Sequence, residues 1–150
     1  TTATMKVTII ESITLNGKNQ GSTNSLTVPN IANISKRIVN VPASEVEIVA
    51  MSSAVGSGTF ITADVLYIRI TNLDDTNHVT LTFKSVGNHE FAVKLDTGQS
   101  FIYNGDLAGG AAATMDASAS ALSLSLADLV NITATADSGA CDLEVFVACD

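Results

Sequence analysis

The residues of this 150-residue chain that could carry acid, base or metal chemistry are few and scattered. His78 and His89 are the only histidines, and a catalytic triad or a zinc site needs histidine beside specific partners. We expect both to be solvent-exposed turn residues at opposite ends of one strand. The sequence therefore predicts no shared histidine site.

Two carboxylate pairs are the next candidates for chemistry. Glu45 and Glu47 alternate onto one face of a predicted strand, and Asp74 and Asp75 share a predicted turn. Paired carboxylates can hydrolyse glycosides, but sugar-binding aromatic residues are scarce: two Tyr, five Phe and no Trp. The turn at Asp74 lacks the ligand spacing of an EF-hand, so ordinary turn hydrogen bonding is favoured over bound calcium.

Motif searches add no further chemistry. The chain contains no G-x-S-x-G, H-E-x-x-H, P-loop or C-x-x-C pattern. We therefore expect a protein that is not an enzyme, with no catalytic, cofactor-binding or metal-binding residues and no cofactor.

Cys141 and Cys149 lie eight residues apart in what reads as one strand. At about 3.3 Å per residue they would be roughly 26 Å apart. A disulfide needs Cα atoms about 4.4–6.8 Å apart, so we expect two free thiols and a reducing place of synthesis.

Charge is distributed unevenly along the chain. Residues 95–150 hold eight of the 15 acidic residues and none of the seven Lys and Arg, so the net charge of −8 falls in the last third. Without a basic patch, neither nucleic acid nor an anionic membrane is an expected partner.

No apolar run approaches the roughly 20 residues of a membrane span, and the first residues do not resemble a signal peptide.

The segment 64–105 is the most regular part of the sequence. Apolar and polar residues alternate with period two over 65–71, 79–84, 91–95 and 101–103, with turn residues between. This pattern predicts four strands of an antiparallel meander with one buried face, to which the other strands add. Because aromatic residues are only 5% of the chain, Val, Ile, Leu and Ala must fill the core.

The flanking segments predict more strands. A long first strand is expected over 4–15 and ends at the tight-turn pair Asn16-Gly17. A polar loop follows, then a short strand at 26–28 that Pro29 should stop. The remaining expected strands are 31–41, 45–51, 59–61, 122–126, 131–136 and 143–148. The predicted fold is all-β: residues 1–150 form a single two-sheet antiparallel β-sandwich of about ten strands, with a jelly-roll or related Greek-key topology.

One connection stands out because it has no period and is built of Gly, Ala, Ser and Asp. It spans residues 104–120, which is long for a loop inside a compact domain. Three interpretations remain open: a crossover loop covering one end of the sandwich, an arm that reaches a neighbouring subunit, or a flexible tether. For a protein that assembles, the candidate contact regions are this loop, the N-terminal residues 1–10, and the strand with the basic pair Lys36-Arg37.

Parts of the sequence resemble small virion structural proteins of tailed bacteriophages, particularly those of marine and cyanobacterial hosts. The resemblance rests on YIRITNLDD (67–75), VTLTF (79–83), EFAVKLDTGQSFIYNG (90–105) and CDLEVFVA (141–148). It implies a β-sandwich located in the virion and made in the bacterial cytoplasm, with a role as a capsid decoration (cement) protein. Its partners would be the major capsid protein or another virion protein, and further copies of itself, with a trimer favoured.

The resemblance leaves other functions open. A tail, head-fibre or portal-vertex component is the nearest alternative within the virion. A β-sandwich can also serve as a carbohydrate-binding or cell-surface-binding module, or as a subunit of a bacterial surface filament, because fold alone does not define function.

Overall fold

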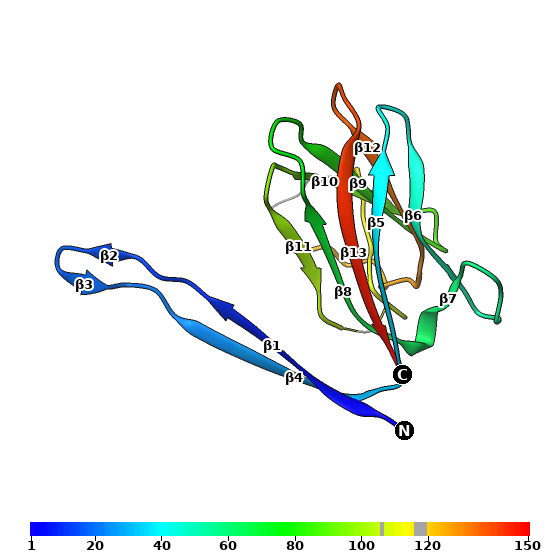
Figure 1. Cartoon of the computed structure of the whole chain (residues 1–150). Helices are drawn as coiled ribbons and strands as arrows, with labels where there is room; N and C mark the ends of the chain where they lie inside the picture. Colours follow the sequence, from blue (N-terminus) through cyan, green and yellow to red (C-terminus); the bar gives the residue numbers. More distant parts are fainter. Residues whose placement is uncertain (106, 116–119) are drawn as a thin grey trace.

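The computed structural model describes residues 1–105, 107–115 and 120–150, and within them it is built almost wholly of β-strands (Figure 1). A three-residue 3-10 helix, Thr62–Asp64, precedes β8. Among the described residues, no helix is long and apolar enough to cross a membrane. The strands are β1 (Ala3–Ile10), β2 (Thr14–Leu15), β3 (Lys18–Asn19), β4 (Thr23–Ile31), β5 (Asn33–Val41), β6 (Val46–Ser52), β7 (Phe60–Ile61), β8 (Val65–Asn72), β9 (Val79–Ser85), β10 (Glu90–Leu95), β11 (Ser100–Tyr103), β12 (Leu129–Ala136) and β13 (Cys141–Cys149).

The body of the molecule consists of two sheets. One has five strands in the order β10-β9-β12-β6-β7, and the other has four in the order β11-β8-β13-β5. All pairs are antiparallel except the short parallel pair of β6 and β7. The prediction of an all-β, mainly antiparallel, two-sheet fold is therefore confirmed.

The four strands expected within 64–105 all form, but they do not form one meander. β8 pairs with β11 and β13, whereas β9 pairs with β10 and β12. The chain therefore crosses from one sheet to the other after β8 and crosses back before β11. Alternation tells which face of each strand is buried, but it does not tell which strand lies beside it, and this is why the meander prediction was wrong.

The core lies between the two sheets and is filled mainly by aliphatic side chains, as the composition predicted. Phe83 of β9 is 1% exposed and joins the sheets. Its ring stacks on Phe91 of the neighbouring strand with centroids 4.8 Å apart, and it meets Phe101 of the opposite sheet at 4.9 Å.

The N-terminal third differs most from expectation. Instead of one strand over 4–15, the chain forms a hairpin that projects from the body, with β1 paired to β4 and β2 paired to β3 (Figure 1). The Asn16-Gly17 turn is confirmed: both residues have positive φ, 54° and 79°, as a type I′ hairpin turn requires. Pro29 does not end the strand, because it lies at a register shift of β4 next to Asn30, whose φ is 63°.

The long connection after β11 is partly built into the core. Leu107 is fully buried, and the Tyr103 hydroxyl donates to the Gly110 carbonyl oxygen at 2.7 Å. Ala111 and Ala127 pair in an isolated antiparallel bridge, and the strand expected over 122–126 does not form. The described residues 107–111 thus support the crossover interpretation, while residues 106 and 116–119 of this predicted loop lie outside the described residues.

Candidate functional site

The projecting hairpin, residues 3–31, is the most distinctive feature of the surface, and we call it the arm. Met5 is paired with Val28, and Leu15 with Lys18, in one unbroken register. Between these two paired regions, the backbone hydrogen bonds Glu11 N to Ser22 O and Gln20 N to Ile13 O keep the same register at 2.8 Å each. The arm is therefore one continuous two-stranded ribbon.

The arm has two faces of different chemistry. Because side chains alternate along a strand and cross-strand partners share a face, one face is largely apolar and the other is mainly Ser, Thr and Lys. The hydrogen bond between the Thr8 and Ser25 hydroxyls, 3.3 Å, lies on the polar face. The apolar face carries Met5, Val7, Ile9, Glu11, Ile13 and Leu15 from the first strand, and Lys18, Gln20, Ser22, Asn24, Leu26 and Val28 from the return strand. Ile10, which is 69% exposed, lies on the polar face.

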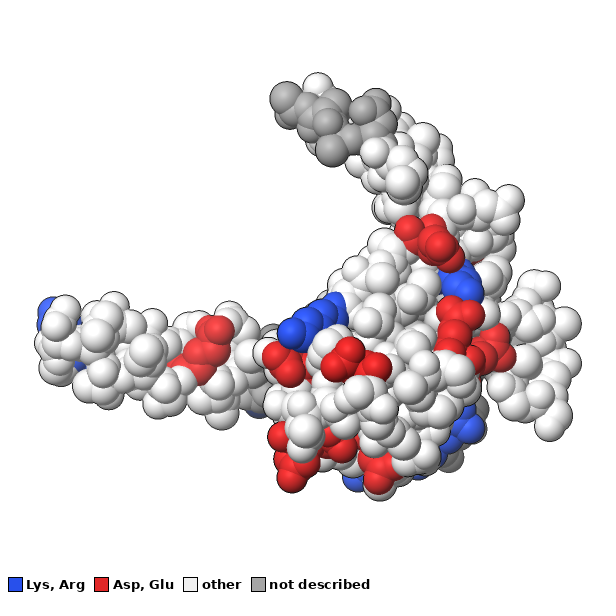
Figure 2. Space-filling view, turned by 90° about the horizontal axis from the view of Figure 1, so that it is seen from above, with Lys and Arg blue, Asp and Glu red and all other residues white. Residues whose placement is uncertain are grey.

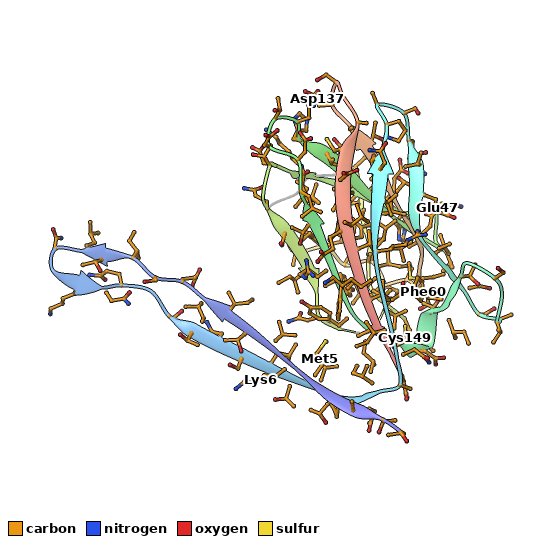
Figure 3. All side chains as sticks on the ribbon, in the orientation of Figure 1. Met5, Lys6, Glu47, Phe60, Asp137 and Cys149 are labelled. Atoms are coloured by element: carbon orange, nitrogen blue, oxygen red, sulfur yellow. The ribbon has the colours of Figure 1, made fainter. Side chains whose placement is uncertain are left out.

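The base of the arm is anchored to the outer face of the four-stranded sheet. Val28 and Ile31 of β4 form a small second core with Tyr67 of β8 and Ala148 of β13. In Figure 3, Met5 points from β1 toward the body, whereas Lys6 points away from it. Burial of these apolar side chains fixes where the arm leaves the body, since an isolated two-stranded hairpin is only marginally stable in water.

A groove of about 430 Å³ separates the arm from the sheet beyond this anchor, between β1 and the side chains of Tyr67, Arg69, Ile102 and Phe146. Arg69 lies over the Phe146 ring, 5.7 Å from its centroid, and forms an ion pair with Glu144. Arg69 also donates to the Thr71 hydroxyl. The hydrogen bond from Arg69 lowers the pKa of Glu144, so this carboxylate stays ionised.

Past the groove the apolar face of the arm is uncovered. Ile9, Ile13 and Leu15 are 45%, 56% and 55% exposed. On the body, Ile34 and Ile38 of β5 point outward from the same sheet and are 59% and 62% exposed. The arm leaves past the β11 edge, away from β5, so it does not cover them (Figure 1).

The arm and the body of the molecule also differ in net charge. Residues 1–31 contain Lys6, Lys18 and Glu11, which gives them a formal charge of +1. Because the whole chain has a net charge of −8, the remaining 119 residues have a net charge of −9. Figure 2 shows the arm as a narrow, mostly uncharged projection and the acidic side chains gathered on the body. The site can thus bury apolar surface and pair opposite charges.

His78 and His89 lie apart in the structure, as predicted. They lie at opposite ends of β9, as expected, but both are half-buried rather than fully exposed. His78 Nδ1 lies 3.9 Å from an Asp137 carboxylate oxygen. His89 Nδ1 is buried without a hydrogen-bond partner among the described residues.

The carboxylates are held in separate local networks. Glu45 accepts from Lys84 and from the Thr133 hydroxyl, whose hydrogen bond is the main reason its pKa is lowered. Glu47 accepts from the Asn131 amide at 2.8 Å. Asp74 accepts from two backbone N–H groups of its own turn, which lowers its pKa. Asp74 therefore makes the turn hydrogen bonds that the sequence favoured.

Cys141 and Cys149 lie at the two ends of β13 as free thiols, as predicted, and both are buried. Within the described residues, no cluster of three or more His, Cys, Asp or Glu is arranged to hold a metal ion.

Sequence reasoning proposed residues 1–10 as a candidate contact region but missed the arm. The missing part was its second strand, because β4 carries many Ser, Thr and Asn residues and contains Pro29. A signal was present in the alternation of Met5, Val7, Ile9, Ile13 and Leu15 up to the Asn-Gly turn. That pattern predicts a hairpin whose return strand must follow the turn directly.

A scan against protein-family models finds no match to the chain, and a search of curated proteins finds none either. The arm and the sheet face are therefore interpreted from their own geometry.

Proposed function

We propose that this protein is a non-enzymatic structural protein of a bacteriophage virion, a capsid decoration protein that binds the assembled shell and stabilises it. The observation that carries the proposed role in assembly is the exposed apolar face of the arm, because exposed apolar patches of this kind mark sites of protein–protein contact. The phage identity rests on the sequence resemblance of 67–105 and 141–148.

The proposed partners are the major capsid protein and other copies of the chain, in a trimer. A trimer suits a capsid lattice, which presents threefold sites. A chain with only 15% charged residues supports this proposal, because the cores of protein interfaces are depleted in charge. The proposed mechanism is mass action: a protein that binds only the assembled shell shifts the equilibrium toward that shell.

The test is binding to undecorated shells of the parent virus. We expect the purified protein to co-sediment with the shells and raise their melting temperature, and we expect the protein to be found in purified particles. At a free concentration 100 times the Kd, binding would add about 2.7 kcal/mol per site. Absence from purified particles, together with no binding to shells, would reject the virion role.

The control is a variant in which the tip of the arm, 12–21, is replaced by a two-residue Asn-Gly turn. Because Glu11 and Ser22 form a hydrogen-bonded pair, as Leu15 and Lys18 do beside the natural turn, this turn closes a shorter hairpin in the same register. It should fold like the parent and bind shells more weakly if the arm contributes to assembly.

A further inference from the structure

We propose that the apolar face of the arm binds the outer face of β5 in a second copy of this chain. This inference deepens the assembly role proposed above by naming the contact and the partner. It concerns the free protein, so it does not depend on which particle the protein joins.

Two of the apolar surfaces that the described residues leave uncovered suggest this partner. The far half of the arm exposes Ile9, Ile13 and Leu15, and the outer face of β5 exposes Ile34 and Ile38. Both surfaces are faces of antiparallel β-structure, and such faces pack on one another with their strands nearly aligned. At about 3.3 Å per residue, the eight residues from Thr8 to Leu15 span roughly 26 Å, close to the roughly 30 Å of β5.

The two surfaces also match in the spacing of their charges. Along the arm face the order is Ile9, Glu11, Ile13 and then Leu15, with Lys18 paired beside it. Along the outer face of β5 the order is Ile34, Lys36, Ile38 and then Asn40, with Asp142 paired beside it.

Laid in the same direction with Ile9 on Ile34, these two series bring opposite charges together. Glu11 then faces Lys36, two residues farther Ile13 faces Ile38, and Lys18 faces Asp142. Each pair repeats at the two-residue period of side chains on one strand face, so no adjustment of either backbone is needed. The series from Ile9 to Ile13 would match β5 equally well in the reverse direction, so the pair of Lys18 and Asp142 is what favours this direction.

The charged groups beside this face are exposed and can make these contacts. Among the described residues Lys36 of β5 forms no ion pair, although its charge acts on the neighbouring Glu144, and the Asp142 side chain of β13 accepts from the Asn40 amide at 2.9 Å. Glu11 accepts from the Ser22 hydroxyl through Oε1 at 3.3 Å, which leaves its second oxygen for a cation. Opposed net charges, +1 on the arm and −9 on the rest of the chain, favour the encounter.

This contact joins two different patches, so a chain of such contacts closes into a ring when the rotation between copies allows it. A ring of three copies agrees with the trimer proposed above. Each copy would then give its arm to one neighbour and receive an arm from the other.

The test is a charge exchange measured by native mass over a concentration series. Glu11→Lys and Lys36→Glu should each weaken association by about tenfold or more, because like charges then face one another. The double variant E11K/K36E should restore it. Lys94→Glu is the matched control, since Lys94 is an exposed cation on β10 of the other sheet, and it should leave association unchanged.

A second measurement does not depend on affinity. Ile13→Cys and Ile38→Cys are prepared separately, one with a mass tag, and the mixture is treated with a short thiol cross-linker. We expect a heterodimer in the mixture of twice 15.5 kDa plus the tag. The control partner is Val86→Cys in the β9–β10 turn, because Val86 and Ile38 are both 62% exposed. It should give no heterodimer with I13C.

The outcomes separate this inference from the virion role. Failure of the double variant to restore association, or a parent protein that stays monomeric with no I13C–I38C heterodimer, overturns the arm contact. If the arm contact is found but the protein does not bind shells, only the virion role fails. If shells bind the protein while the charge exchange has no effect, only the arm contact fails.

Discussion

Arg69 Nη2 of β8 and Glu144 Oε1 of β13 lie 2.5 Å apart on the outer face of the four-stranded sheet. Both side chains are partly covered, 26% and 21% exposed, and they border the groove below the arm. This pair joins two central strands at the place where the arm leaves the body. It is also the most direct source of pH dependence on this face.

Acid should weaken this link. The hydrogen bond from Arg69 holds the pKa of Glu144 below its ordinary value of 4.5. A carboxyl group with a lowered folded-state pKa stabilises the fold above its unfolded pKa, and this contribution is lost as pH falls through the folded pKa. In Arg69→Met the pKa of Glu144 should rise toward its ordinary value, as a carboxyl-carbon NMR titration would show.

The control for this titration is Lys18→Met, which removes a cation from the tip of the arm. It should leave the titration of Glu144 in the free monomer unchanged. A pKa of Glu144 that is the same in the parent and in R69M would show that the ion pair does not determine it.

Phe83 should contribute more to stability than any exposed apolar residue. Its ring is 1% exposed and contacts Phe91 in its own sheet and Phe101 in the other. Phe83→Ala removes contacts on both sides of the core, so we expect a loss of about 3–5 kcal/mol in the free energy of unfolding. Urea denaturation measures it, and Val86→Ala at a 62% exposed position should change stability by less than about 0.5 kcal/mol.

Asn72 should be needed for the crossing between the sheets. Its side chain is buried, and its amide nitrogen donates to the carbonyl oxygens of Asn77 at 3.0 Å and Leu95 at 3.2 Å. Its side-chain oxygen accepts from the backbone N–H of Asp74 at 2.9 Å. These bonds tie together the two segments where the chain changes sheets.

Asn72→Leu keeps a similar volume but leaves those backbone groups without their partner. Each buried unsatisfied group costs about 1–3 kcal/mol, so thermal unfolding should begin well below that of the parent. Asn77→Ala, which removes only a side chain of the same turn, is the comparison. Equal stability of N72L and the parent would contradict the role given to Asn72.

The connection after β11 should divide into a structural part and a dispensable part. Leu107→Ala should cost about 2–5 kcal/mol, because Leu107 is fully buried. Ala111 and Ala127 exchange backbone hydrogen bonds of 3.1 and 2.8 Å. Replacing 112–126 with an Asn-Gly turn should therefore close a short hairpin and keep the melting temperature close to that of the parent.

The same shortened variant tests the assembly role that the sequence suggested for this loop. The replacement begins after Ala111, because a deletion that starts earlier would remove core residues such as Leu107. If the shortened protein folds and still assembles like the parent, the loop is not a contact region.

Much of this protein follows from local sequence pattern. The two-residue alternation in β8, β9 and β10 determined their existence, and Asn16-Gly17 determined a tight turn through its tolerance of positive φ. The separation of Cys141 and Cys149 along one strand determined that they are unpaired thiols. These features depend on neighbouring residues or on the geometry of one strand, so the sequence alone is sufficient.

Only the tertiary structure decided which strands lie side by side. β13 lies between β5 and β8, although more than 60 residues separate it from either along the chain, and no local pattern contains that pairing. The arm was decided in the same way, because Met5 and Val7 are partly buried against the small core that contains Tyr67, whereas Ile13 and Leu15 on the same face are exposed. Alternation marks a face that can be buried, and long-range packing determines how much of it the chain itself covers.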